Sequence, residues 1–195
     1  GHQTPLNQVG RRAFSSESAV AGKQKKLGVI WIDAHADINT LASSASGNVH
    51  GMPLAFCTGI DTSWQWVNEA NLKLDFQDLY YWGIRDLDNF EIDVIDRYGI
   101  KVLQDKEECM QIVDEYEHIH TSLDIDGIDP QYAPSTGTRA EHGLELKDVL
   151  DYLYYLKFAR KSIGFDLVEY NPDIGTEEEK RTTEQTVKSL LHAIV

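Results

Sequence analysis

The chain has 195 residues, 42% of them hydrophobic, which is enough for one domain with a substantial core. Its 32 acidic and 18 basic residues give a formal net charge of −14, which argues against binding to nucleic acid or to an anionic membrane surface, because both would repel the protein. The acidic excess suits bound cations or a cationic substrate, and it equally suits simple solubility.

The first 26 residues, GHQTPLNQVGRRAFSSESAVAGKQKK, predict a polar loop or arm with Glu17 as its only acid. Within it, GRRAFSSES faintly resembles a transit peptide, which makes mitochondria the alternative to the cytoplasm. Cys57 and Cys109 lack metal-type spacing, so we expect both to be packing residues. This use of cysteine fits a reducing compartment, and the cytoplasm is therefore the expected location. No stretch approaches the ~20 apolar residues of a membrane helix, and no signal peptide is evident.

From Leu27 onward, short apolar runs alternate with segments of helical periodicity. The runs that predict strands are 27–32, 79–84, 99–103, 119–125 and 162–168. The segments that predict helices are 89–98, 106–116, 145–159 and 177–194. Runs that are apolar on both faces and separated by helices indicate a parallel sheet covered on both sides. We therefore predict an α/β fold for residues 27–195, with three layers, α-β-α, around a mostly parallel sheet.

Five potential metal ligands follow two of these runs. Asp33, His35 and Asp37 come directly after the first run, and Asp124 and Asp126 close the fourth. Alternate side chains of an extended segment point the same way, and parallel strands end at one edge of the sheet, so we expect these groups to converge. Four carboxylates and an imidazole would repel one another without divalent cations, and this donor mixture favours Mn or a similar ion over Ca. The sequence therefore predicts a two-metal site in which water becomes a hydroxide nucleophile.

Each motif alone also has a simpler explanation. Asp and His cap helices and hydrogen-bond within loops. The DIDGID stretch could form a turn or a calcium loop, but the flanking runs predict strand rather than the helices of an EF-hand. For Asp86, a pair with Arg85 or a role in a turn is an equally good explanation. The two motifs together, both at strand ends, favour the metal interpretation.

Five sequence blocks, in order, cover residues 27–195 almost end to end: WIDAHADINT, SGNVHGMPLAF, GIRDLDNFE, SLDIDGIDPQYAPSTGT and DLVEYNP. With these blocks the chain resembles the arginases of the ureohydrolase family. SGNVHG in particular resembles arginases, since agmatinases carry a different segment there. The resemblance implies the three-layer fold, without one or more N-terminal strands, because a family portion on the order of a hundred residues has no counterpart here.

The resemblance implies two Mn ions held by the five ligands. Asp33 and Asp124 would bridge the ions, His35 and Asp126 would complete one site, and Asp37 would belong to the other. The resemblance also implies an upstream Gly-Gly-Asp-His-Ser block whose histidine binds the same ion as Asp37, and the sequence has no such block. We therefore expect the ion at Asp37 to bind more weakly.

Three further residues lie where the sequence departs from the family pattern or could compensate for the departure. SSESAVAG is faintly similar to the missing block, with Glu17 at the position of the histidine, a likeness that we attribute to chance. His2 is another candidate ligand. His142 occupies a place usually given to glycine, and we expect it to perturb only a loop.

The resemblance also implies the catalytic and substrate-binding residues. His50 matches a proton-shuttling histidine, although by itself it would predict a hydrogen-bonded loop residue, and Glu169 matches a carboxylate near the guanidinium. Asp37 is counted as catalytic through its metal, and Thr138 matches a threonine near the guanidinium pocket. The positions that hold the other end of the substrate, directly or through water, are Asn39, Ser46, Asn48, Asp88 and Glu91.

The expected function is that of an arginase, a hydrolase that converts L-arginine and water to L-ornithine and urea through a metal-bridging hydroxide. A guanidinium carbon is a poor electrophile, which is why a metal-activated nucleophile is needed, and a histidine can relay a proton to the leaving amine. One alternative is a catalytically impaired relative that acts as a regulatory or partner subunit. Another is an agmatinase-type ureohydrolase. L-arginine is the expected partner, together with identical subunits in a homo-oligomer.

Overall fold

The computed structural model describes residues 25–64 and 73–195. Five strands form one parallel sheet in the order β3-β2-β1-β4-β5. The strands are β1 (Lys25–Ile32), β2 (Leu79–Trp82), β3 (Lys101–Leu103), β4 (Tyr116–Asp124) and β5 (Ser162–Val168). The helices are α2 (Pro53–Thr58), α4 (Asn89–Tyr98), α5 (Lys106–Glu115), α6 (Leu146–Ala159) and α7 (Glu177–Ile194), with short 3₁₀ helices η1 (Val49–Gly51), η2 (Phe76–Asp78) and η3 (Ile125–Gly127).

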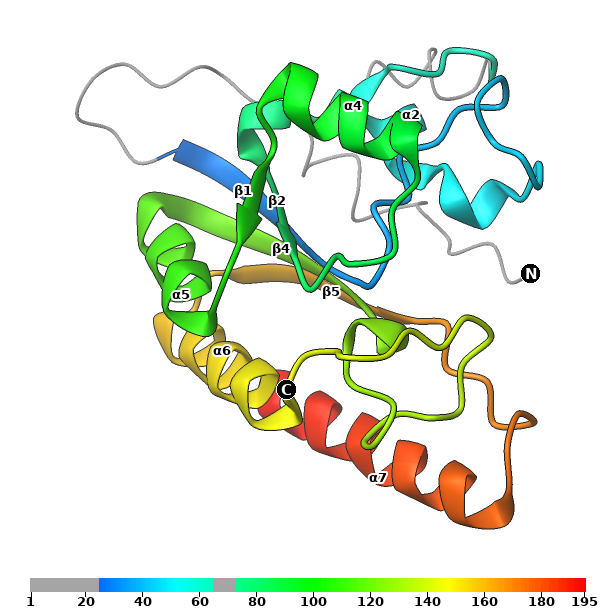
Figure 1. Ribbon diagram of the computed structural model, residues 1–195. Coiled ribbons are helices and arrows are strands. Elements are labelled where there is room, and N and C mark those ends of the chain that lie inside the picture. The colour runs from blue at the N-terminus through cyan, green and yellow to red at the C-terminus, as the bar shows by residue number, and fades with distance from the viewer. Residues whose placement is uncertain (1–24, 65–72) are drawn as a thin grey trace.

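Helices cover both faces of the sheet, which confirms the predicted three-layer α/β fold (Figure 1). On one face, α5, α6 and α7 pack against Ile30, Ile32 and Leu123 of the central strands. On the other face, α2 and α4 pack against Val29 and Tyr81. Burial of apolar side chains on both faces is what fixes a parallel sheet between helical layers.

Local signals set the ends of the helices. A capping box begins α4, because the Asp88 carboxylate accepts the Glu91 N–H while the Glu91 carboxylate accepts the Asp88 N–H. Thr176 and Glu179 form the same arrangement at the start of α7. Both helices have the predicted bounds, because the residues that form each cap lie only a few positions apart in the sequence.

The structure corrects several predicted boundaries. The strand predicted to reach Ile84 ends at Trp82, because Gly83 takes a left-handed conformation with φ 96°. Tyr116 begins β4 rather than ending a helix, and Ile125 belongs to η3 rather than to the strand. The third strand starts at Lys101, and α2 was not predicted.

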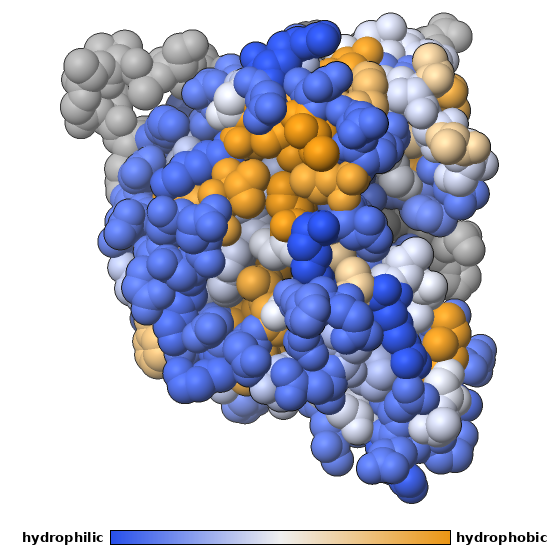
Figure 2. All heavy atoms as spheres, viewed as in Figure 1, coloured by the Kyte–Doolittle hydropathy of each residue, from blue (hydrophilic) through white to orange (hydrophobic). Residues whose placement is uncertain are grey.

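The predicted arm lies outside the described residues up to residue 24, and Lys25 and Lys26 belong to β1. Cys57 and Cys109 are both free thiols that lie among the hydrophobic residues of the two cores, as predicted. Within the described ranges, no helix is both long enough and apolar enough to span a membrane. In the space-filling view, the surface is mainly hydrophilic, with hydrophobic residues gathered between α4 and α5 (Figure 2).

Replacing Arg160 by glycine is expected to raise the free energy of unfolding by about 0.5–1 kcal/mol. Arg160 is the exposed C-cap of α6 and has φ 56°, a left-handed conformation that costs free energy for arginine and none for glycine. Denaturant unfolding of the metal-free protein measures the change. The matched control is Arg97→Gly in the last turn of α4, where the backbone is helical and glycine should destabilise by a similar amount. Destabilisation by both substitutions would contradict the argument.

Candidate metal centre

Two neighbouring strands deliver the candidate ligands to one edge of the sheet. β1 and β4 run parallel and in register, with Ile32 paired to Leu123, so the residues that follow both strands emerge side by side. The N–H of Asp33 continues the ladder on the other side by donating to the carbonyl of Trp82, at 3.2 Å. The carboxyl edge of a parallel sheet is where such folds place their functional groups.

Asp33, His35 and Asp126 form a compact cluster at this edge. One ligand atom from each side chain lies within 4.8 Å of the other two. The Nδ1 atom of His35 lies 3.3 Å from Oδ1 of Asp33 and 3.3 Å from Oδ2 of Asp126. Both carboxylates are buried, so water does little to screen them. The structure thus brings together three of the five predicted ligands.

A protonated His35 offsets part of the negative charge of this cluster. Burial raises the pKa of Asp33 to about 7. Hydrogen bonds to Asp126 and Asp33 raise the pKa of His35 to about 11. Burial also acts to raise the pKa of Asp126, but hydrogen bonds from His35 and Thr138 outweigh it and leave that pKa below its ordinary value. Among the described residues, His35 is the only ion-pair partner of Asp33 and Asp126.

The donor set fits a divalent metal ion. Two buried carboxylates and one imidazole converge on one point, and a protonated His35 stands where a cation would otherwise balance the charge. Mixed oxygen and nitrogen donors of this kind suit a divalent transition metal. The cluster can therefore hold at least one ion without an unpaired buried charge.

Asp37 and Asp124 lie outside this compact group. Burial raises the pKa of each well above its usual range, and the charge of Asp33 raises both further. One oxygen of Asp124 accepts the N–H of Asp126 at 2.9 Å, and Asp37 has φ 51°, so the backbone is no longer extended there. Both remain predicted ligands that interact with the cluster through charge.

Other side chains hold the cluster in place. The hydroxyl of Thr138 donates to Oδ2 of Asp126 at 2.7 Å, and the N–H of Ala34 donates to Oδ1 at 3.2 Å. The indole of Trp31 donates to Oδ2 of Asp33 at 3.0 Å. Trp31 was missed by the sequence argument, although its place two residues before Asp33 puts both side chains on the same side of the strand.

Three of the predicted substrate-binding residues form one hydrogen-bonded network beside the cluster. The amide of Asn39 donates to Oδ2 of Asp88 at 2.7 Å, and the other oxygen of Asp88 serves the capping box with Glu91. Ser43 donates to Oδ1 of Asn39 at 2.7 Å. The capping box thus fixes Asp88 and Glu91, while Asn39 and its loop are tied to the start of α4.

The remaining predicted residues are exposed. Ser46 accepts the N–H of Asn48 at 3.2 Å, and His50 lies in η1. Glu169 follows β5 and has φ 59°. Among the described residues, four non-glycine residues have a positive φ, and two of them, Asp37 and Glu169, are candidate site carboxylates. Backbone strain of this kind often occurs at functional sites. The third, His142, has φ 62°, a conformation that favours the glycine the family pattern has there.

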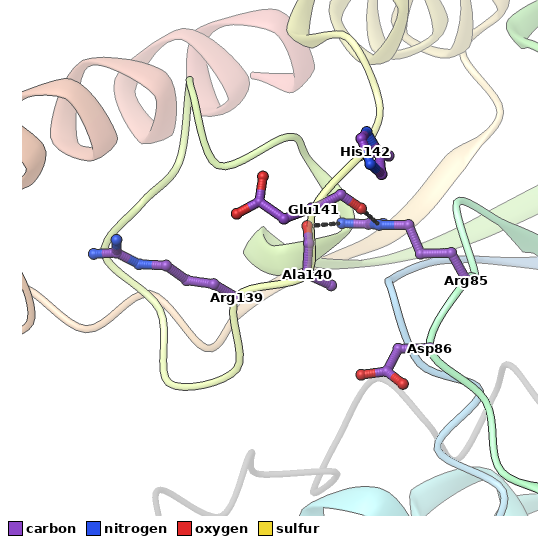
Figure 3. A pocket seen from close by; sticks show the side chains of 6 residues that line it. All are labelled: Arg85, Asp86, Arg139, Ala140, Glu141 and His142. Carbon is purple, nitrogen blue, oxygen red and sulfur yellow. Dashed lines mark hydrogen bonds between the residues drawn. The ribbon is translucent and has the colours of Figure 1, made fainter.

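The structure has a cavity of about 440 Å³, and Figure 3 shows the side chains that line it. Its lining residues are Arg85, Asp86, Arg139, Ala140, Glu141 and His142. Oδ2 of Asp86 lies 3.6 Å from Nε2 of His35, which connects the cavity to the cluster. Within the described part of the chain, Arg85 makes no ion pair with Asp86, and its donors bind backbone carbonyls instead. The alternative prediction, an ion pair between Arg85 and Asp86, is therefore wrong.

Comparison with known proteins identifies relatives of this chain. The model of the arginase family matches residues 12–195. The arginase of Emericella nidulans is 37% identical over 186 residues, which cover 86% of this chain and 57% of that protein. The arginase of Saccharomyces cerevisiae is 36% identical over 186 residues, with 83% and 54% covered. The chain therefore spans little more than half the length of these curated relatives.

Solved structures show the same fold. Entamoeba histolytica arginase in complex with L-ornithine superposes with a TM-score of 0.75 at 34% identity, covering 85% of this chain and 60% of that chain. Arginase from Bacillus cereus gives a TM-score of 0.76 at 32% identity, covering 88% of this chain and 63% of that one.

Proposed function

This chain belongs to the arginase family, and from that premise we propose that it hydrolyses the guanidinium group of L-arginine, giving L-ornithine and urea, with Mn²⁺ as its metal. The observation that carries the proposal is the cluster of Asp33, His35 and Asp126 at the carboxyl edge of the sheet, in which both carboxylates are buried. Mn²⁺ would supply the positive charge that balances these carboxylates and activates water for attack on the guanidinium carbon.

We assign the metal ligands in two groups. Asp33, His35 and Asp126 would hold one ion, and Asp37 and Asp124 would contribute to a second, with Asp33 and Asp124 shared between the two. The sequence contains no Gly-Gly-Asp-His-Ser block to add a histidine to the second ion. The second ion is therefore expected to bind more weakly than the first, because it has one neutral donor fewer.

The chain's own groups would bind and orient the substrate. Glu169 would orient the guanidinium through charge-assisted hydrogen bonds, and His50 would relay a proton to the leaving amine. Thr138 would act through the Asp126 carboxylate to which it donates. The amino-acid end of the substrate would meet the polar residues Asn39, Ser46, Asn48, Asp88 and Glu91.

Urea release from L-arginine and from agmatine, each titrated with Mn²⁺, tests this function. We expect release that rises with Mn²⁺ and is at least about tenfold faster with L-arginine, since the proposed polar groups recognise the carboxylate that agmatine lacks. Faster release from agmatine would favour an agmatinase-type enzyme. A folded chain that binds Mn²⁺ and releases no urea from either compound would favour the catalytically impaired relative.

A further inference from the structure

We propose that Arg85 is a positioning residue that fixes the two ligand-bearing strand ends at the separation a metal ion requires. The inference rests on the proposed function for the identity of the metal, Mn²⁺. Arg85 follows β2 and lies at the wall of the cavity beside the cluster (Figure 3).

The guanidinium of Arg85 binds the segment that carries Asp126. Its Nη2 donates to the carbonyl of Asp126 at 2.7 Å, and its Nη1 donates to the carbonyl of Gly127 at 3.2 Å. A further bond from Nη1 reaches the carbonyl of Gly83 at 2.9 Å, in the loop that carries Arg85 itself. The backbone of one metal ligand is thus tied directly to the end of β2.

The same guanidinium also binds the loop that follows Thr138. Nη2 donates to the carbonyl of Ala140 at 2.7 Å and Nε donates to the carbonyl of Glu141 at 2.9 Å, as Figure 3 shows. Thr138, two residues before Ala140, donates to the Asp126 carboxylate. Arg85 therefore restrains Asp126 twice, once through its own carbonyl and once through the loop that orients its side chain.

The backbone of Arg85 binds the other ligand segment. The N–H groups of Arg85 and Asp86 both donate to the carbonyl of Ala34, at 2.8 and 3.0 Å. Ala34 lies between Asp33 and His35, so this bond holds the first pair of ligands. One residue thus links the segment after β1 to the segment after β4.

The chemistry of the side chain makes this role specific to arginine. A guanidinium has five N–H donors in a rigid plane, and here each donor has a carbonyl acceptor. Lysine carries the same charge but has three donors on a flexible stem, so it cannot bind all these carbonyls at once. Asparagine or glutamine would provide fewer donors still.

The sign of the change in metal affinity separates positioning from a simple charge effect. If Arg85 acted only as a cation near the carboxylates, Arg85→Ala would tighten Mn²⁺ binding and Arg85→Lys would leave it unchanged. If Arg85 positions the ligands, both substitutions should weaken binding by about 10–100-fold, as losing a group that orients metal ligands does. The two explanations predict opposite results for the alanine variant.

The experiment titrates the metal-free protein with Mn²⁺ and measures unbound Mn²⁺ by electron paramagnetic resonance. Arg139→Ala is the matched control, because Arg139 lines the same cavity but its guanidinium pairs with Glu179 at 2.8 Å and not with the ligand segments. We expect wild-type affinity for Arg139→Ala and weaker binding for both Arg85 variants. Millimolar guanidinium should restore part of the affinity of Arg85→Ala, by occupying the vacated position, and should not improve Arg139→Ala.

Hydrogen exchange of the metal-free proteins gives a second readout. Arg85→Ala should speed exchange of the amides at 126–128 and 140–144, and Arg139→Ala should not. Unchanged or tighter Mn²⁺ binding in Arg85→Ala would overturn the proposal, as would global unfolding of both Arg85 variants that guanidinium fails to reverse. Neither readout uses arginine, so a chain that binds Mn²⁺ but releases no urea would fail only the proposed function. If even the unmodified protein binds no Mn²⁺, the hydrogen exchange of the two variants decides whether Arg85 restrains the ligand segments.

Discussion

Replacing Asp126 by asparagine is expected to weaken Mn²⁺ binding by about a hundredfold or more and to abolish Mn²⁺-dependent urea release. The carboxylate of Asp126 is buried, stays ionised beside His35 and holds hydrogen bonds from Thr138 and Ala34. Asparagine keeps the shape but removes the negative charge that a divalent cation needs. A hundredfold loss of affinity corresponds to about 2.7 kcal/mol less stabilisation by bound metal, so the rise in melting temperature on adding Mn²⁺ should shrink accordingly.

Asp96→Asn is the matched control for this substitution. Asp96 is exposed on α4 and is not among the predicted ligands, and the chemical change is identical. We expect its Mn²⁺ affinity, its urea release and its melting temperature to match those of the unmodified chain. Wild-type Mn²⁺ affinity in Asp126→Asn would remove Asp126 from the metal centre and leave the cluster without its ionised carboxylate.

Replacing Gly127 by alanine is expected to destabilise the protein by about 2–3 kcal/mol and to weaken Mn²⁺ binding as well. A Cβ atom at Gly127 would lie 2.9 Å from the nitrogen and 3.0 Å from the Cα of Asp33, and 3.2 Å from the carbonyl carbon of Ile32. These are backbone atoms at the end of β1, so relief requires moving the segment that carries Asp33 away from the segment that carries Asp126. Denaturant unfolding without metal measures the first effect, and an Mn²⁺ titration measures the second.

The matched control for this prediction is Gly137→Ala. A Cβ atom at Gly137 would meet no heavy atom within 4 Å, and its φ is not in the left-handed region. The same substitution should therefore change the free energy of unfolding by less than about 0.5 kcal/mol. Equal losses in the two variants would show that the close approach at Gly127 is not what makes alanine costly there.

Local patterns in the sequence were enough to predict most of the fold. The helices α4 and α7 begin at the positions that helical periodicity predicted, and Asp88 and Thr176 cap them there. The strands were found because parallel strands buried on both faces are continuous apolar runs. The short helix α2 escaped prediction because six residues offer too little periodicity.

The alternation of acidic residues predicted the side-chain cluster at the strand ends only in part. Asp33 and His35 lie as expected at the end of β1, and Asp126 joins them from the end of β4. The rule that alternate side chains share a side holds only for extended backbone. At Asp37 the backbone has turned to φ 51°, and the segment after Asp124 is a 3₁₀ helix. The residues of the two motifs therefore do not present their side chains as two straight strands would.

The sequence by itself determined the α/β class, the ends of the main helices and the residue types that gather at the strand ends, because each depends on neighbours a few positions apart. The tertiary structure alone decided how those strand ends are held together. Arg85 joins carbonyls on either side of the cluster, Trp31 binds Asp33, and Gly127 allows two backbones to touch. Most of these contacts join residues tens of positions apart, and they form only because the order β2-β1-β4 places three strand ends side by side.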